Sequence, residues 1–441
     1  MDFQKLKEEA LKNGIKEIEV YSVKENGIEI STYNDEVDTN VLSQTDVLAI
    51  RGVYNKQIVT IYEENNNDEM IPKIINKIIE NASLIDKNEP YFIYGGDKNY
   101  ETISEAKNDF DDYNTKDKAD LCLKLKDLIF AKSDTVKSVS ASYSEHDVAV
   151  SIINSNGLNV SKHNKYAFIA VEVVCSLNEE MKTGFDYVYL KNIKDFQMDK
   201  LADSAFLDAY ESFNAESIKS GNYKVVLDKS VVSSLLSAFS NIFSADAVIK
   251  NMSFLKDKLG EKIFGENITI IDDPMFELAT SKDTFDDEGV KSTEKTLVEN
   301  GKLITYLHNL KTASIMKTKS TGNGYKASAS SSVGVSPSNL YLKPGKVEFA
   351  EMLKVVDNGI YVNSVQGLHA GLNPISGDFN LQASGFLIEN GKKTKPITLF
   401  ILSGKLQDML NNVVYLGNDF EIKGSVGAPS ITIEKMAISG K

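Results

Sequence analysis

The sequence predicts an α+β fold, with an N-terminal α+β domain followed by a C-terminal domain rich in strands and turns. Residues 1–220 hold only seven of the 27 glycines and two of the eight prolines, so tight turns crowd the second half. The first half instead carries apolar residues at helical spacing and long runs rich in β-branched residues. We therefore expect two domains, residues 1–220 and 221–441, with the boundary close to Gly221.

In the first domain, helices are predicted where apolar residues recur every three or four positions, and strands where β-branched residues gather. Asn26-Gly27 and Asn156-Gly157 are dipeptides typical of hairpin turns. The expected helices are residues 3–12, 68–83, 116–131 and 193–213, and the expected strands are residues 18–23, 28–33, 47–53, 57–62, 136–153, 166–176 and 183–190.

The second domain opens with a predicted strand at residues 223–227 and an amphipathic helix at residues 230–243. Asn300-Gly301 and Asn390-Gly391 predict further hairpins, and Asn358-Gly359 precedes an apolar run. The remaining expected elements are strands at residues 360–365, 420–423 and 430–433 and a helix at residues 406–412.

Charge and composition limit the classes of partner. The formal net charge of -14 argues against general affinity for nucleic acid, whose phosphates attract basic surfaces. No apolar run approaches the ~20 residues that a membrane helix needs. Only two cysteines are present, Cys122 and Cys175, and both lie among apolar residues, where we expect core side chains. These features predict a cytoplasmic protein that binds neither nucleic acid nor a membrane.

The four histidines, at positions 146, 163, 308 and 369, lack the spacing of a helical metal site, in which two histidines lie about four residues apart. For His146 and His163 we expect polar strand or turn positions. His308 adjoins an asparagine and His369 lies in a glycine-rich loop, so a structural and a functional role are equally open for both.

Two further segments are rich in polar and glycine residues. Residues 367–379 combine glycines, an Asn-Pro step, His369 and Asp378, a composition typical of loops that hold backbone close to a ligand or partner. Asp286-Asp287-Glu288 precedes a glycine, where we expect a solvated turn, although such clusters also bind hard cations. The chain contains no Walker lysine motif and no Gly-x-Ser-x-Gly elbow.

The second half carries an ordered series of short motifs, such as Phe-Asp-Asp-Glu-Gly at residues 285–289 and Asn-Pro at residues 373–374. The whole series covers residues 285–290, 297–301, 307–313, 320–324, 373–379, 383–386, 404–409, 417–419 and 424–430. Through these motifs the second half resembles the PmbA/TldE subunits of the TldD/PmbA peptidase family. The first half resembles the family's N-terminal domain through its opening helix and hairpin.

The resemblance implies a cytosolic subunit that pairs with a TldD-like catalytic subunit to cleave unfolded peptides. In that family the TldD-like subunit carries a His-Glu-x-x-x-His helix that binds zinc. The corresponding helix here, residues 230–243, contains no histidine and no glutamate. We therefore expect no metal, no cofactor and no catalytic residue in this chain, and zinc in the partner.

The resemblance also implies a cavity for peptide or partner. We expect it to be lined by His308, His369, Asn373, Gly377, Asp378 and Phe379. The glycine-rich segment at residues 372–379 would offer backbone amides and carbonyls to an extended peptide by β-augmentation, or to the partner's active site. Asp286, Asp287 and Glu288 would fix a turn at the edge of this cavity.

Two other functions stay open at this stage. One is a homodimeric, non-catalytic protein that binds peptides or another protein, as the description of family members as modulators of DNA gyrase implies. The other is a peptidase with a non-standard metal site that uses His308 and His369, although these histidines are 61 residues apart and their spacing gives it no support.

Overall fold

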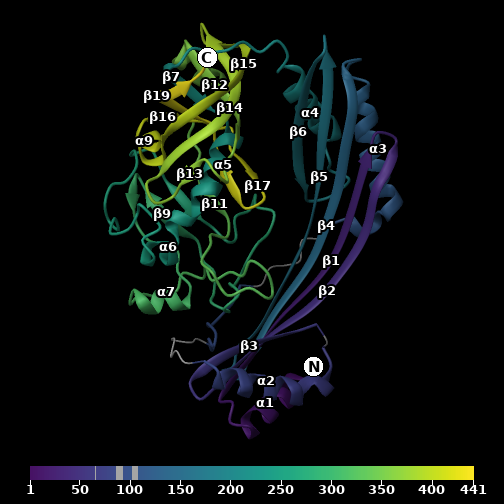
Figure 1. Ribbon diagram of the computed structural model, residues 1–441, viewed down its shortest axis with the longest axis vertical. Helices are drawn as coiled ribbons and strands as arrows, with labels where there is room; N and C mark the ends of the chain where they lie inside the picture. Colours follow the sequence, from purple (N-terminus) through teal and green to yellow (C-terminus); the bar gives the residue numbers. More distant parts are fainter. Residues whose placement is uncertain (65, 86–92, 102–107) are drawn as a thin grey trace.

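The computed structural model describes residues 1–64, 66–85, 93–101 and 108–441 and shows an α+β protein, as predicted. Figure 1 shows two bodies side by side: a tall, curved sheet with helices at both ends, and a compact body made from the second half of the chain. No helix in the described part of the chain is long and apolar enough to cross a membrane.

The curved sheet is antiparallel throughout, with strand order β3-β2-β1-β4-β5-β6. Its central strands are 17 to 19 residues long, so at about 3.3 Å per residue they extend roughly 60 Å. The strands are β1 (Glu17–Tyr33), β2 (Glu36–Tyr54), β3 (Gln57–Glu63), β4 (Val136–Asn154), β5 (Asn159–Leu177) and β6 (Glu180–Leu190).

One face of this sheet carries two separate cores because the strands are so long. Ile18, near the start of β1, packs with helices α1 (Phe3–Lys12) and α2 (Ile71–Ser83). Ile30, near its end and on the same face, packs with the cluster beneath α3 and α4. Helices α3 and α4 span Thr115–Phe130 and Met198–Tyr210. Residues of opposite parity, such as Tyr21, point toward the second half of the chain.

The second half contains two sheets, a large shared core and a smaller cluster of buried residues around α8 (Phe349–Val356). In the larger sheet, β12 pairs with both β7 and β14, which closes β12-β7-β19-β15-β14 into a ring. That sheet contains β7 (Gly221–Leu227), β12 (Gly359–Gln366), β13 (Leu372–Asn373), β14 (Asp378–Glu389), β15 (Lys392–Lys405), β16 (Val413–Leu416) and β19 (Ile431–Ser439). The smaller sheet contains β8 (Ile270–Asp272), β9 (Lys295–Glu299), β10 (Lys302–Leu303), β11 (Leu340–Leu342), β17 (Glu421–Lys423) and β18 (Val426–Ala428).

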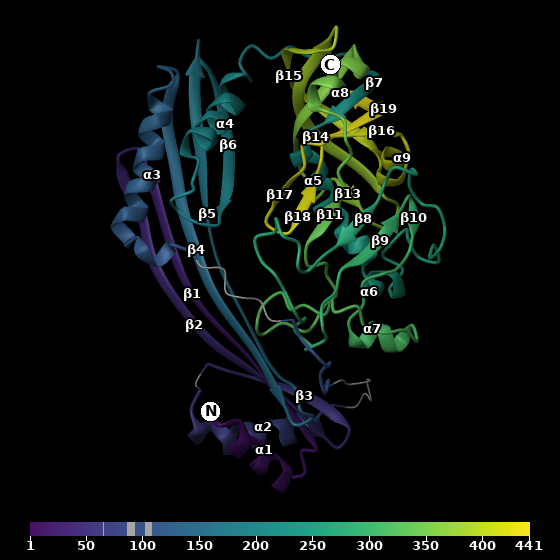
Figure 2. The same cartoon turned by 180° about the vertical axis from the view of Figure 1, so that it is seen from behind.

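The helices of the second half are short. They are α5 (Lys229–Phe239), α6 (Ala245–Ile249), α7 (Leu310–Ile315), α8 (Phe349–Val356) and α9 (Leu406–Asn411). Helix α5 buries its apolar side in the core that both sheets share. Figure 2, seen from behind, shows α5 and β17 on the side of this body that faces the curved sheet.

The predicted hairpin at Asn26-Gly27 is wrong. Residues 17–33 form one continuous strand, and Gly27 lies opposite Ser43 on one side and His146 on the other. A Cβ at Gly27 would lie 2.4 Å from the Ser43 hydroxyl oxygen, so glycine here accommodates a close neighbour instead of a turn.

Two other Asn-Gly predictions are confirmed. Asn300 and Gly301 both have positive φ, 47° and 80°, as do Asn390 and Gly391, which suits tight hairpin turns. The helix predicted at residues 193–213 is shorter than expected and spans Met198–Tyr210. Its first turn is missing because the Asp109 carboxylate accepts hydrogen bonds from the backbone N–H groups of Ile193 and Lys194, which holds them in a turn.

Candidate functional site

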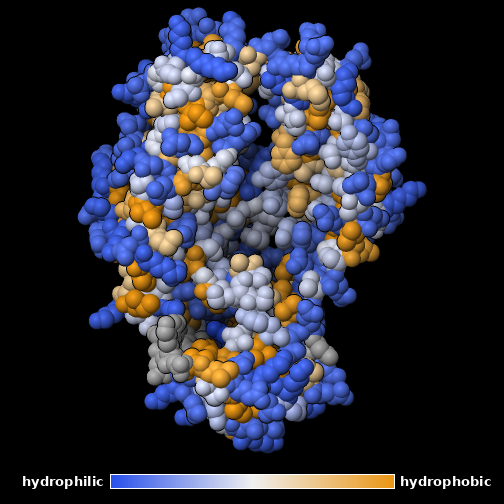
Figure 3. Space-filling model, in the orientation of Figure 1, coloured by the Kyte–Doolittle hydropathy of each residue, from blue (hydrophilic) through white to orange (hydrophobic). Residues whose placement is uncertain are grey.

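A deep cleft separates the curved sheet from the second half of the chain. Figure 3 shows the hollow between the two bodies. The cavity measures about 960 Å³, within the usual range for ligand sites. Strand β6 and helix α4 form one wall, and the other is formed by α5, β12, β14, β15, β17 and β18.

Helix α5 lies along the cleft because its two sides differ in polarity. Asp228 caps its first turn by accepting a hydrogen bond from the Ser230 N–H at 2.9 Å. Apolar side chains from Val231 to Phe239 point into the core. The opposite side presents four serines to the cleft, Ser230, Ser233, Ser234 and Ser237.

The cleft side of α5 does not fit zinc. Protein zinc sites use thiolate, imidazole or carboxylate donors, and serine hydroxyls are neutral and poor substitutes. Within the described ranges, no group of three or more histidine, cysteine, aspartate or glutamate side chains is placed to hold a metal ion. Because residues 230–243 contain no histidine and no glutamate, the cleft side of this helix offers no set of zinc ligands.

Ion pairs across the cleft connect its two walls. Lys393, on β15, pairs with Glu211, just beyond α4, at 2.6 Å, and Lys423 of β17 pairs with Asp186 of β6 at 2.5 Å. Lys423 also lies over the Tyr187 ring, 4.8 Å from its centroid. These two pairs therefore bridge the walls of the cleft.

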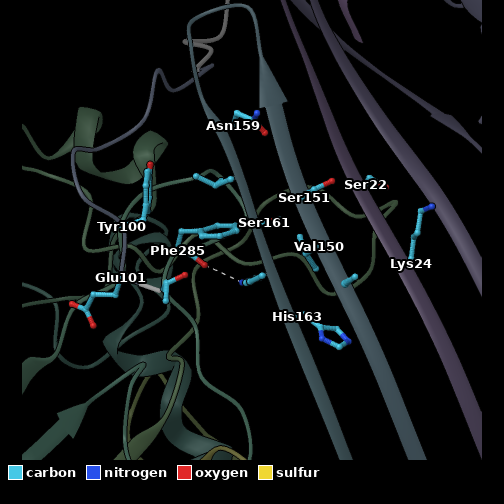
Figure 4. Close-up of a pocket in the computed structure, with 14 residues that line it drawn as sticks. Ser22, Lys24, Tyr100, Glu101, Val150, Ser151, Asn159, Ser161, His163 and Phe285 are labelled. Atoms are coloured by element: carbon cyan, nitrogen blue, oxygen red, sulfur yellow. Dashed lines mark hydrogen bonds between the residues drawn. The ribbon is translucent and has the colours of Figure 1, made fainter. Parts of the chain in front are cut away.

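A second, smaller cavity of about 510 Å³ lies lower on the curved sheet. In Figure 4, Ser22, Ser151 and Ser161 lie on the strands, and Tyr100 and Phe285 face them from the other side. The dashed line marks the hydrogen bond that the Lys162 ammonium donates to the Phe285 carbonyl at 2.9 Å. This cavity therefore lies beside the contact that the 285–290 motif makes with the sheet.

Asp286, Asp287 and Glu288 form a turn, but that turn is buried and the expected solvated position is wrong. Asp286 is fully buried, and its carboxylate accepts hydrogen bonds from the N–H groups of Glu288, Val290 and Gly324. Gly289 completes the turn with φ of 82°. The burial arises because the curved sheet covers this motif.

Charged groups from both halves surround the motif. Lys162 of β5 pairs with Asp283 at 2.7 Å, and the charges of Asp283 and Asp287 hold its pKa above the usual value although burial alone would lower it. Burial raises the pKa of Glu288 to about 7 and lowers the pKa of Lys326 to about 8. The ammonium of Lys326 lies 4.2 Å from the centroid of the Tyr21 ring in β1. The motif therefore joins the two halves electrostatically.

His308 is a buried side chain, 4% exposed, in the segment before α7. Its Nδ1 atom has no hydrogen-bond partner among the described residues, and burial lowers its pKa to about 4. Its backbone is well held, since its N–H donates to the Thr321 hydroxyl and its carbonyl accepts from the Ser320 hydroxyl. The imidazole is therefore neutral near pH 7.

The other predicted cavity residues lie in and beside the hairpin of β13 and β14. His369 is exposed in the loop before β13. The Asn373 side chain accepts hydrogen bonds from the N–H groups of Ile375 and Ser376, which holds the turn that Gly377 completes with φ of 77°. Asp378 is half-buried, whereas Phe379 is 1% exposed and belongs to the main core.

The structure does not gather the predicted site residues around either cavity described above, because His308, His369, Asn373, Gly377, Asp378 and Phe379 line neither of them. The residues that do line the main cleft, such as Tyr187 and Asp208, were missed. One part of the cleft lining could be recognised from the sequence: the polar side of the amphipathic helix predicted at residues 230–243. The strand and the helix that carry Tyr187 and Asp208 have no such feature and resemble ordinary elements of an α+β protein.

Comparison with known proteins identifies the family. The profile of the PmbA/TldA metallopeptidase C-terminal domain matches residues 220–440, and that of the central domain of the same family matches residues 108–209. The chain belongs to the PmbA/TldD family. Together these matches cover more than half of the chain, and they include both walls of the cleft.

Individual relatives agree with this assignment. A metalloprotease of Methanocaldococcus jannaschii is 30% identical over 398 residues, which is 89% of this chain and 81% of the relative. A PmbA homologue of Haemophilus influenzae is 25% identical over 307 residues, and the match spans 69% of this chain and 65% of that protein's length.

Two solved structures share the fold over 99% of the chain and the whole of their own length. A Thermotoga maritima protein described as a proposed modulator of a DNA gyrase has a TM-score of 0.90 at 29% identity. TldE from Thermococcus kodakarensis has a TM-score of 0.89 at 22% identity, a likeness of fold. Within the family, the chain is of the PmbA/TldE type.

Proposed function

We propose that this chain is the non-catalytic, PmbA/TldE-like subunit of a cytoplasmic zinc metallopeptidase that degrades or processes unfolded peptides. The observation that carries the proposal is the serine-lined cleft side of α5, the helix that would correspond to the zinc helix of TldD-like subunits. Zinc and its ligands would come from a TldD-like partner. This chain would contribute the cleft wall that holds the peptide.

The side chains that line the cleft support a peptide ligand. Its walls combine aromatic rings, hydroxyl groups and charged groups, which can contact both the backbone and the side chains of an extended chain. The buried, unpaired thiols of Cys122 and Cys175 support a reducing, cytoplasmic setting.

The test is hydrolysis of a fluorescently labelled, unfolded peptide by this chain, by the His-Glu-x-x-x-His chain from the same genome, and by their mixture. We expect cleavage by the mixture, little by the partner alone, and none by this chain. The control is the mixture after zinc removal by a chelator, which should be inactive until zinc returns. Cleavage by this chain alone would overturn the proposal.

A homodimeric regulator that binds another protein is the second candidate. The similarity to the Thermotoga maritima protein described as a proposed gyrase modulator favours it, and the net charge of -14 suits a protein partner better than DNA. Sedimentation of the purified chain, alone and mixed with the TldD-like chain, separates the two candidates. A homodimer that does not exchange with the TldD-like chain would favour the regulator.

A further inference from the structure

Aromatic side chains of the edge strand β6 form one wall of the cleft. Phe185, Tyr187 and Tyr189 alternate along the strand, so their rings project from the same face. Successive ring centroids lie 6.0 Å apart in both steps. Phe185 is 53% exposed, and the two tyrosines are half-buried.

The row of rings continues across the sheet. The Phe168 ring of β5 lies 5.6 Å from that of Tyr189, and the Tyr166 ring lies 6.3 Å from it. His146 of β4 stacks on Tyr166 at 5.1 Å. We call these six side chains the aromatic ladder: Phe185, Tyr187, Tyr189, Phe168, Tyr166 and His146.

The spacing of the ladder suits an extended peptide. Side chains on one face of an extended chain repeat about every 6.6 Å, close to the separation of the rings. Aromatic rings attract one another at centroid distances of about 4.5 to 7 Å. Only Phe185, Tyr187 and Tyr189 of the ladder line the cleft itself. The two steps of 6.0 Å between their rings match about five residues of an extended peptide. Tyr361 and Phe386, whose rings lie 6.3 Å apart, face the peptide from the other wall.

The charge of the cleft favours a cationic ligand. Its lining includes five carboxylates and three lysines, and each lysine is already paired, with Glu421, Glu211 or Asp186. Asp208 and Asp228 have no lysine or arginine partner within the described ranges. Burial, with the charges of Asp186 and Glu211, raises the pKa of Asp208, as expected for a carboxylate that lacks a counter-charge.

We propose that this cleft selects extended peptides that carry positive charge and have aromatic or other large apolar side chains at alternate positions. The inference rests on the proposed function, because both place a peptide in the cleft. It adds that this subunit contributes to the choice of peptide through its own side chains.

Fluorescence anisotropy of the purified full chain with three labelled peptides of about ten residues tests the selection. The first peptide alternates Phe and Ser between terminal Lys residues, the second has Ser in place of Phe, and the third has Glu in place of Lys. We expect the first to bind at least about tenfold more tightly than either of the others, since each stacked ring contributes modestly and several act together. Equal affinities, or no binding by any of them, would overturn the inference.

Variants localise the effect. Phe185→Ser combined with Tyr187→Ser should weaken binding of the Phe-rich peptide about tenfold. The control, Tyr33→Ser combined with Tyr62→Ser, removes two exposed rings of the same sheet outside the cleft and should leave affinity unchanged.

Asp208→Asn should reduce the preference for Lys over Glu, whereas Asp199→Asn, at an exposed position of the same helix, should not.

The two proposals fail in different ways. If the assembled pair cleaves peptides but this chain shows no preference among the three, the inference is wrong and the proposed function stands. If the three peptides bind as expected but no mixture with the TldD-like chain cleaves any peptide, the inferred selection of peptides is retained and the proposed function as a peptidase subunit is wrong. Circular dichroism of each variant shows whether a loss of binding reflects a loss of fold.

Discussion

At the scale of single residues, Lys162 shows how the family motif at residues 285–290 is held. Its side chain is 7% exposed, and it pairs with Asp283 and donates a hydrogen bond to the Phe285 carbonyl. Lys162→Met would leave the Asp283 and Asp287 carboxylates without their cation, and we expect a loss of about 3 kcal/mol in the free energy of unfolding. Urea denaturation measures it.

The matched control is Lys24→Met. Lys24 lines the same small cavity but is 59% exposed, and its pair with Asp46 at 3.4 Å is open to solvent. Such pairs contribute less than about 1 kcal/mol. Equal losses in the two variants would show that the buried charge is not what holds the motif.

His308 gives a prediction for pH. Its pKa is about 4 in the folded chain against an ordinary value of 6.5, so the unfolded chain binds its proton more readily. The stability that this group contributes is complete above pH 6.5 and is lost as the pH falls toward 4. The His308→Gln variant should lose about 3 kcal/mol less than the unmodified chain across that range.

Denaturation midpoints measured at several pH values test this prediction. His146→Gln is the control, since His146 is partly exposed and pairs with Glu25. Parallel pH profiles for the unmodified chain and His308→Gln would contradict the assigned burial of a neutral imidazole.

Also at this scale, the sequence could predict the turn at residues 286–288 but not its surroundings. An aspartate followed by Glu-Gly favours a tight turn through local hydrogen bonds alone. Its burial depends on Lys162, more than 120 positions earlier, and on the Tyr21 side of β1. Local pattern carries no information about such distant partners, so the turn was expected to be solvated.

At the scale of elements, the packing of α4 on β6 depends on Gly184. A Cβ there would lie 2.1 Å from the Ala205 carbonyl oxygen and 2.5 Å from the Ala209 nitrogen, both of them backbone atoms of the helix. Gly184→Ala should therefore displace α4 and cost about 2 kcal/mol. Thermal denaturation and the crystal structure of the variant both report on it.

Gly27→Ala is the matched control on the same sheet. The added Cβ would meet only the Ser43 hydroxyl, which can rotate away, so we expect a change below about 1 kcal/mol. If Gly184→Ala were as mild as Gly27→Ala, the close contact between strand and helix would not be what positions this wall of the cleft.

Turns show why some elements were predictable and others were not. Asn300-Gly301 and Asn390-Gly391 adopt positive φ and connect neighbouring strands, as the dipeptide predicts. Asn26-Gly27 has the same letters but lies between two long partner strands that supply hydrogen bonds on both sides. Strand pairing over 17 residues outweighs the local preference of one dipeptide. The neighbouring strands that provide this pairing cannot be identified from the residues around Asn26 alone.

At the scale of the whole molecule, Phe285 connects the two halves. It is 1% exposed and packs with Tyr21, Val150 and Ile152 of the curved sheet. Phe285→Ala should cost about 3 kcal/mol and uncouple the halves, so that calorimetry would resolve two unfolding transitions. Phe239→Ala, in the core of the second half, should lower stability without such splitting. A single transition in both variants would contradict this role.

The α+β architecture of each half was predictable from the sequence, because each half forms its own cores. The cleft between the halves was not predictable. The division near Gly221 stays a prediction. The profile of the central domain ends at residue 209, and that of the C-terminal domain begins at residue 220. The cleft walls come from five separate stretches of sequence: β6 with α4, α5, β12, β14 with β15, and β17 with β18. Only the fold brings them together, which is why the site was expected around the glycine-rich loop instead.

The proposed function requires that this chain lack the catalytic metal and contribute a peptide-binding wall. Zinc content per chain, measured without a chelating tag after brief exposure to zinc, distinguishes this chain, its TldD-like partner and their complex. We expect no zinc in this chain and about one per complex, held by the partner. About one tightly bound zinc in this chain alone would overturn the proposed function and make His308 and His369 the first side chains to replace.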